Sequence, residues 1–230
     1  DYDKLIRSSS ARAFMGKSGF SYSIFSTYFS DNVTLCGELS LDNNYNTGLK
    51  LGSAYRSEKF DFALHVRSFD ENYRAPFGSI FGEFSYPANE IGIYTGFAWK
   101  KNSFFNMFTY FDYFRSYVPT YSIDTNITGF EIFTQFNINI SRQTSFYTRF
   151  LFKNKTSQHK DKDKKTIYFY QREKIGTRIE VSHDFSKSLT IRNRMELALI
   201  DNKNIIPNEI GIAAFLECTW KITNYLKLQS

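Results

Sequence analysis

The feature that most constrains this chain is an alternation of apolar and polar residues that continues for long stretches. Between Phe130 and Ile140 the even positions are nearly all apolar, while the odd positions carry Glu131 and several amides. The stretches from Leu189 to Leu199 and from Ile210 to Trp220 repeat this arrangement. Successive side chains of a β-strand point to opposite faces of a sheet, so a period of two predicts strands with one apolar and one polar face.

Applied to the whole chain, this period predicts strands that run for about ten to eighteen residues, against the five or six of a typical globular strand. The predicted strands lie at 19–29, 32–42, 46–56, 59–69, 90–100, 103–114, 127–140, 142–153, 166–183, 188–200 and 208–221, and a further one begins near Asn224.

Short and long connections alternate between these strands. The short ones are Ser30–Asp31, Ser57–Glu58, Lys101–Asn102, the surroundings of Ser141, Asp184 to Lys187, and Ile222–Thr223. The long ones are Asn43 to Tyr45, Asp70 to Asn89, Arg115 to Asn126, Asn154 to Lys165, and Asp201 to Pro207. In an antiparallel up-and-down meander, this alternation places all tight turns at one end and all longer loops at the other.

Composition agrees with finely interleaved faces. Aromatic residues make up 19% of the chain, with 25 Phe and 16 Tyr, yet the mean hydropathy is only −0.41. Long alternating strands with unequal ends are typical of an all-β, antiparallel up-and-down transmembrane β-barrel, in which lipid covers the apolar face. A soluble β-barrel or sandwich that binds an apolar ligand remains the alternative, because there the apolar face forms a core.

The stretch from Asn89 to Arg115 shows how the faces divide. We expect Ile91, Ile93, Phe97, Trp99, Phe105, Met107, Phe111 and Tyr113 to face lipid, and Glu90, Gly92, Tyr94, Asn106 and Asp112 to face inward.

Ionisable residues recur on the predicted inward face. They either line a water-filled conduit that selects solutes by charge, or pair with one another to fill the lumen. Arg192, Arg194 and Glu196 form the densest group. With His65 beside them on this face, the predicted lumen-facing charged residues are Glu38, Lys50, Asp61, Arg67, Glu131, Arg149, Arg178, Glu180, Arg192, Arg194, Glu196 and Glu217.

Two connections invite separate hypotheses. The charged run from Lys153 to Lys165 is either a loop that contacts phosphate or lipopolysaccharide, or a solvated extracellular loop of mixed charge, and the second interpretation is favoured. The aromatic-containing segment from Asp70 to Asn89 could dock a partner protein, fold into the lumen, or add short strands.

Other classes of function receive little support. The three histidines, His65, His159 and His183, form no recognisable catalytic set, so we expect no enzyme. Cys36 and Cys218 match no metal-ligand spacing, and no glycine-rich phosphate loop is present, so no metal or cofactor is expected. The net charge of +6 is spread along the chain without an aromatic stacking platform, which argues against nucleic-acid binding by this segment.

Several short motifs resemble the β-barrel region of bacterial outer-membrane proteins that carry competence-type helix-hairpin-helix motifs ahead of the barrel. They are LCGELS (Leu35 to Ser40), LGSAYR (Leu51 to Arg56), SYPANEIGIYTGFAW (Ser85 to Trp99), MFTYFDYFRSYVP (Met107 to Pro119) and FYTRFLFKNK (Phe146 to Lys155).

The resemblance implies a location in the bacterial outer membrane, with membrane lipid as the main partner. We expect residues 1–18 to be a lead-in or the end of a preceding strand, and residues 19–230 to be a barrel that, by this resemblance, continues beyond the closing YLKLQS. We therefore expect a passive conduit, or an anchor and scaffold for a periplasmic domain. A component of a secretion or surface-attachment complex, bound to other membrane or periplasmic proteins, is the alternative.

Overall fold

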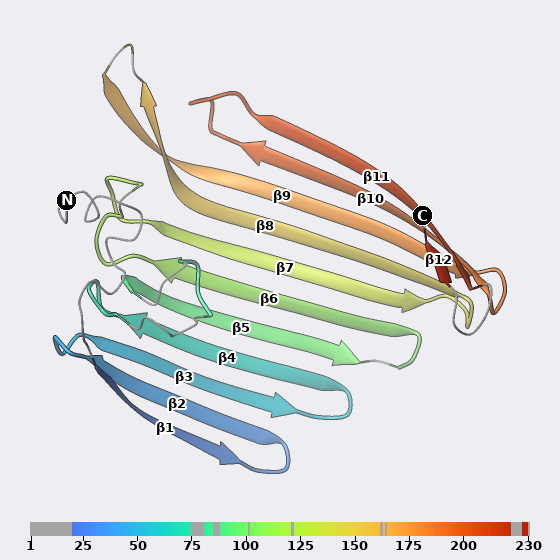
Figure 1. The fold of residues 1–230 in the computed structure, drawn as a ribbon, viewed down its shortest axis with the longest axis horizontal. Helices are drawn as coiled ribbons and strands as arrows, with labels where there is room; N and C mark the ends of the chain where they lie inside the picture. The colour runs from blue at the N-terminus through green and yellow to red at the C-terminus, as the bar shows by residue number, and fades with distance from the viewer. Residues whose placement is uncertain are drawn as a thin grey trace.

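The computed structural model describes residues 20–74, 81–84, 88–100, 102–120, 122–161, 163, 165–221 and, for the backbone alone, 227–229. These residues form one twisted, curved antiparallel sheet of twelve strands, in which every strand pairs with its neighbours in the sequence (Figure 1). The strands are β1 (Ser21–Phe29), β2 (Val33–Asp42), β3 (Thr47–Arg56), β4 (Phe60–Phe69), β5 (Glu90–Lys100), β6 (Phe105–Arg115), β7 (Thr128–Asn139), β8 (Thr144–Asp161), β9 (Thr166–Asp184), β10 (Leu189–Asp201), β11 (Glu209–Lys221) and β12 (Lys227–Gln229).

The predicted all-β, antiparallel up-and-down architecture is confirmed. The long connections, such as those after β4 and β6, lie at one end of the sheet and the tight turns at the other (Figure 1). Asparagine and serine side chains shape these turns. For example, the side chain of Asn102 accepts hydrogen bonds from the backbone N–H groups of Phe104 and Phe105, and Ser141 does the same for Gln143 and Thr144.

One connection differs from its prediction. Most of the charged run that was predicted to form a loop between 154 and 165 belongs to β8, which continues to Asp161, and β9 begins at Thr166. Pairing of β7 with β8 ends at Lys155, and the two-stranded ribbon of β8 and β9 continues alone from Thr156 onward. Figure 1 shows this ribbon projecting past the other strands. The β8 half of the ribbon, from Thr156 to Asp161, has no apolar residue, and this composition concealed the strand.

Closure of the sheet into a barrel is not seen. Within the described residues, no ladder joins β1 to β12, so closure stays a prediction. The predicted lead-in at 1–18 and the predicted strand start near Asn224 lie outside the described residues. No helix among the described residues is long and apolar enough to cross a membrane.

Register keeps the two faces of the sheet separate. The charged face, as we call it, bears Arg67, Glu131 and Arg194, and the apolar face bears Ile93 and Leu197. Large apolar side chains on this face are exposed across the sheet, with a few polar residues such as Ser53 and Asn193 among them. They include Ile24, Leu35, Leu39, Leu51, Phe60, Phe62, Ile91, Ile93, Trp99, Phe111, Tyr113, Ile132, Phe150, Ile179, Val181, Met195, Leu197, Ile210, Ile212, Leu216 and Trp220. Edge strand β1 also exposes Phe25 and Phe29 on its charged face.

The fully buried side chains gather at the end of the sheet that carries the long connections. Phe69, Phe114 and Ile127 are buried there, and Tyr73 stacks on Phe69. Asn89 holds two connections together, because its side chain accepts the backbone N–H groups of Tyr117 and Val118. This end of the charged face is therefore covered by the protein's own loops.

Gly92 on β5 makes room for the side chain of Arg67. A Cβ atom added at Gly92 would lie 2.5 Å from the guanidinium carbon of Arg67, which cannot move aside because two carboxylates hold it. We expect Gly92→Ala to destabilise the protein by about 1–3 kcal/mol. The matched control is Gly176→Ala, whose Cβ would make only ordinary contacts with Leu151 and should change stability by less than about 0.5 kcal/mol. Urea unfolding of both variants checks this, and equal stabilities would contradict it.

Candidate functional site on the charged face

The centre of the charged face is a buried ion-pair network around Arg67. Its guanidinium donates through Nε to Glu90, and through both terminal nitrogens to the carboxylate of Asp112 at 2.8 and 3.2 Å. The side chains of Arg67 and Glu90 are completely buried, and that of Asp112 is largely so. Arginine suits this position because its planar group can donate to two carboxylates at once. The network joins strands β4, β5 and β6.

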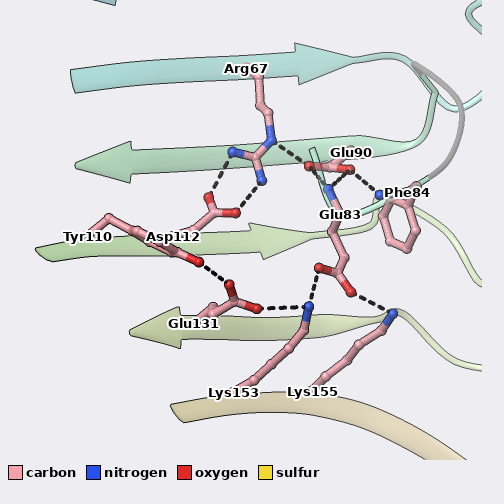
Figure 2. Close-up of polar contacts among 9 residues, drawn as sticks. All are labelled: Arg67, Glu83, Phe84, Glu90, Tyr110, Asp112, Glu131, Lys153 and Lys155. Atoms are coloured by element: carbon pink, nitrogen blue, oxygen red, sulfur yellow. Dashed lines mark hydrogen bonds and ion pairs between the residues drawn. The ribbon is translucent and has the colours of Figure 1, made fainter. Parts of the chain in front are cut away.

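Residues 81–84 of the long β4–β5 connection lie on this network. Glu90 accepts the backbone N–H groups of Glu83 and Phe84 at 3.1–3.2 Å, as Figure 2 shows. The ring of Phe81 meets the rings of His65 and Tyr94 edge-on. These four residues therefore fold back over the charged face, which is the face that was predicted to point inward.

Glu83 extends the network across the sheet to β8. Its two carboxylate oxygens accept hydrogen bonds from Lys153 at 2.7 Å and Lys155 at 2.9 Å. Lys153 also lies 3.1 Å from Glu131, which accepts a hydrogen bond from the Tyr110 hydroxyl. Figure 2 shows the contacts running from Tyr110 on β6 through Glu131 on β7 and Lys153 on β8 to Glu83.

The charge state of Glu83 follows from these contacts. Burial by itself would raise the pKa of the Glu83 carboxyl, but the hydrogen bonds and charges of Lys153 and Lys155 outweigh it and hold the pKa below its ordinary value. Both ammonium groups also lie over aromatic rings, Lys153 over Phe114 and Lys155 over Phe84, at 5.6 and 5.7 Å from the ring centres. The loop is thus held by an ionised carboxylate at neutral pH.

We expect the docking of residues 81–84 to weaken in acid. Because the pKa of Glu83 is lowered in the folded state, its contribution is present above the ordinary value of 4.5 and is lost as pH falls through the lowered pKa. Hydrogen exchange of the amides of Glu83 and Phe84 between neutral pH and about pH 3 measures this.

The control for this titration is Glu83→Gln. Glu90, Asp112 and Glu131 are carboxylates that face the same loop, so some pH dependence remains in the variant. In this variant the amides of residues 83 and 84 should already exchange rapidly at neutral pH. The further loss of protection in acid should be smaller than in the parent protein. An unchanged pH profile in Glu83→Gln would contradict the assignment to Glu83.

A second group of charges lies on the charged face of β9, β10 and β11. Arg178 lies 2.6 Å from Glu196, and Arg194 donates to Glu180 at 2.8 Å. Arg192 lies at ion-pair distance from Glu180 at 3.3 Å, without hydrogen-bond geometry, and at 3.4 Å from Glu217. These side chains are partly exposed, so each pair contributes little stability and the charges remain open to solvent and solutes.

All twelve predicted lumen-facing charged residues lie on the charged face, but the structure divides them. Arg67 and Glu131 belong to the buried network. The six on β9 to β11 form the second group of ion pairs, which we call the charge ladder: Arg178, Glu180, Arg192, Arg194, Glu196 and Glu217. Glu38 pairs with Lys50 at 2.7 Å, and Asp61 pairs with Lys100 at 2.6 Å. Arg149 lines a hollow of about 540 Å³ together with Tyr110, Glu131 and Glu196.

Sequence reasoning missed Glu83. It placed Lys155 in a connection, and it took Lys153, the last residue of the predicted strand 142–153, as the start of a charged loop. Glu90 and Asp112 were expected to face inward but were not included among the candidate site residues. Lys153 and Lys155 are two and three steps of two residues beyond Arg149 on the same strand. Continuing the period of two past residue 153 would therefore have placed both lysines on the charged face. No pattern pointed to Glu83, because its position depends on how a long connection folds back.

The other reactive side chains have ordinary surroundings. His183 makes a 2.8 Å hydrogen bond with the Thr144 hydroxyl, and His159 pairs with Tyr168 on the projecting ribbon. Cys36 and Cys218 are free thiols on β2 and β11. Among the residues that the structure describes, no group of three His, Cys, Asp or Glu side chains is placed to hold a metal ion.

Comparison with known proteins gives a structural similarity but no sequence match. No family model matches the sequence. No curated protein matches it either. The chain is similar to a solved structure described as "NanC porin structure in rhombohedral crystal form", with 10% sequence identity, coverage of 90% of this chain and 96% of that chain, and a TM-score of 0.40. Neither the identity nor the TM-score bears on what this chain binds or conducts.

Proposed function

We propose that this chain is the membrane-spanning part of an outer-membrane β-barrel that acts as a passive aqueous conduit. The observation that carries the proposal is the contrast between the two faces of the sheet. Large apolar side chains such as Ile93, Ile132 and Leu197 are exposed on one face, whereas charged side chains line the other and are partly covered by the protein's own loop.

This contrast is the reverse of what a soluble β-barrel needs. Monomeric soluble proteins rarely expose continuous apolar patches beyond a few hundred Å², and the exposed apolar residues here occur on every strand from β1 to β11. A transmembrane barrel presents an apolar band to lipid and a polar interior to water. A tilted strand of about 9–11 residues crosses the hydrocarbon region. Strands β2 and β10, with 10 and 13 residues, are long enough.

Fractionation of native cells, followed by gel mobility with and without heating, tests the location and the closed barrel. We expect recovery in the outer membrane and a heat-dependent shift in mobility. Recovery in a soluble fraction without detergent would refute the membrane assignment. Purified protein inserted in a planar lipid bilayer then tests the conduit, because an anchor or a plugged barrel would give no steady conductance.

The charge ladder on β9 to β11 gives a direct test of selection by charge. Replacing both Arg192 and Arg194 with Gln should leave folding intact, because these side chains are partly exposed. The two substitutions remove positive charge while Glu180 and Glu217 remain, so the reversal potential in a salt gradient should shift towards cation selectivity. The double variant Lys59→Gln/Lys187→Gln removes the same net charge at two turns and is the control. Equal shifts of the reversal potential in the two double variants would contradict a role for the charge ladder.

We further propose that the chain comes from an outer-membrane protein of the helix-hairpin-helix type. The order of its short aromatic motifs, from LCGELS at Leu35 to FYTRFLFKNK at Phe146, supports this. The corresponding test is to read the gene on both sides of this segment, where a helix-hairpin-helix segment ahead of the barrel and further strands after it are expected.

A further inference from the structure

A cluster of like charges lies where β8 and β9 pair. In the antiparallel register Lys153 stands directly opposite Lys174, and Lys155 stands directly opposite Arg172. Side chains opposite one another on adjacent strands are only about 5 Å apart at Cβ, and like charges there are destabilising. Two consecutive cation pairs on the charged face are therefore stabilised by anions that lie between them.

Carboxylates of the protein pair with only part of this cluster, and two of its cations, Arg172 and Lys174, are exposed to solvent. Glu83 neutralises part of it through Lys153 and Lys155, and Glu131 contacts Lys153. Arg172 is 3.4 Å from the exposed carboxylate of Glu209. Within the described part of the chain, Lys174 makes no ion pair, although its neighbour across the ladder is a second lysine.

The same cations surround a hollow that can hold a small molecule. A cavity of about 340 Å³ is lined by Lys153, Lys155, Arg172 and Lys174, by Glu83, and by the hydroxyl-bearing residues Thr156 and Ser157. Within it, Glu83 shows how a carboxylate binds, since each of its oxygens accepts a hydrogen bond from its own ammonium group. Lysine and arginine groups of this kind bind carboxylates and phosphates through charge-assisted hydrogen bonds.

We propose that Lys153, Lys155, Arg172 and Lys174 form a binding site for small solutes that carry a carboxylate or phosphate group, and that Glu83 occupies part of this site as an internal carboxylate. A solute anion competes with Glu83 and binds most tightly where Lys174 has no carboxylate of its own. The inference deepens the proposed conduit by naming its substrate class, and it rests on that proposal only for the route by which a solute arrives.

Isothermal titration of the full chain in zwitterionic detergent micelles, with succinate and with inorganic phosphate as separate probes, tests the site. Such micelles contain no anionic lipid headgroup, so binding reports on the free solute. We expect Glu83→Gln to bind at least one probe about tenfold more tightly than the parent, a change of about 1.4 kcal/mol. Adding Lys174→Gln to that variant should reverse the gain.

Matched variants separate this effect from net charge. Glu71→Gln removes the same charge from the same connection, and within the described residues Glu71 makes no ion pair and accepts a hydrogen bond from its neighbour Asn72. Lys59→Gln is the corresponding control for Lys174→Gln, because it removes the same charge at a distant turn. Equal affinities in Glu83→Gln and Glu71→Gln, or no loss with Lys174→Gln, would overturn the proposal. If Lys174→Gln does not fold, as judged by the loss of the heat-dependent gel shift, Arg172→Gln is used as the second substitution instead.

The outcome remains distinguishable from that of the conduit test. Anion binding without conductance in a planar bilayer would refute the conduit and retain the site. Conductance together with unchanged binding in Glu83→Gln and Lys174→Gln would refute the site and retain the conduit.

Discussion

A lysine in place of Leu197 should destabilise the protein in a lipid bilayer by about 2–4 kcal/mol, as charged residues near the midplane of transmembrane barrels do. Leu197 is exposed on the apolar face in the middle of β10. If lipid covers that face, the ammonium group must either enter hydrocarbon or distort the bilayer to reach water. Urea unfolding of protein folded into vesicles measures the cost.

The control is the next residue along the same strand. Ala198 lies on the charged face and lines the hollow of about 540 Å³ beside Gly176 and Gly211. Lysine at this position has space and water, so Ala198→Lys should change stability by less than about 0.5 kcal/mol. The comparison holds strand, depth and chemistry constant and changes only the face. Equal costs for the two variants would show that the faces have been assigned wrongly, and equal tolerance would favour a solvent-exposed sheet.

Loss of the Arg67 guanidinium should have an equally large effect through a different cause. Arg67→Met removes the cation that Glu90 and Asp112 share, and it leaves two buried carboxylates without their partner. Breaking a buried ion pair from one side costs about 3–5 kcal/mol, because the remaining charge keeps its desolvation penalty. The free energy of unfolding in urea measures this, and the backbone amides of Glu83 and Phe84 should lose protection with it.

Two comparisons identify the cause. Lys50 stands opposite Arg67 on the same face, but its pair with Glu38 is about one-third exposed on both sides, so Lys50→Gln should cost only about 0–1 kcal/mol. Adding Glu90→Gln and Asp112→Asn to Arg67→Met removes the stranded charges and should restore much of the loss. If the triple variant were no more stable than the single one, the loss would come from packing around Arg67 and not from unpaired charge.

The fold could be predicted from the sequence because lipid-facing and inward-facing positions leave a period of two in nearly every strand. β5 shows this most clearly, since Ile91, Ile93 and Trp99 alternate with Glu90 and Gly92 and the strand begins and ends where predicted. Alternation did not predict the strand where the face that is otherwise apolar carries no apolar residues. Beyond Lys155 the strand β8 has no hydrophobic face, so its backbone ladder continues in a composition that is typical of loops.

The candidate site was predictable only in part. Alternation places Arg67, Glu131 and Arg192 on one face, but it contains no information about the depth at which each lies or what covers it. Arg67 is buried because residues 81–84 fold back over it, and that contact joins residues distant in the chain. Gly92 carried a hint, because a residue without a side chain in a central strand often marks a close approach by another group.

The pairing of every strand with its sequence neighbour has a consequence for assembly and for evolution. Each hairpin can form from a short, continuous piece of chain, so the entropy of closing long loops is small and folding can proceed one hairpin after another. An inserted or deleted hairpin would leave the register of all remaining pairs unchanged. Proteins of this architecture can therefore change circumference in steps of two strands, while a charge cluster confined to one hairpin, such as that of β8 and β9, is inherited whole.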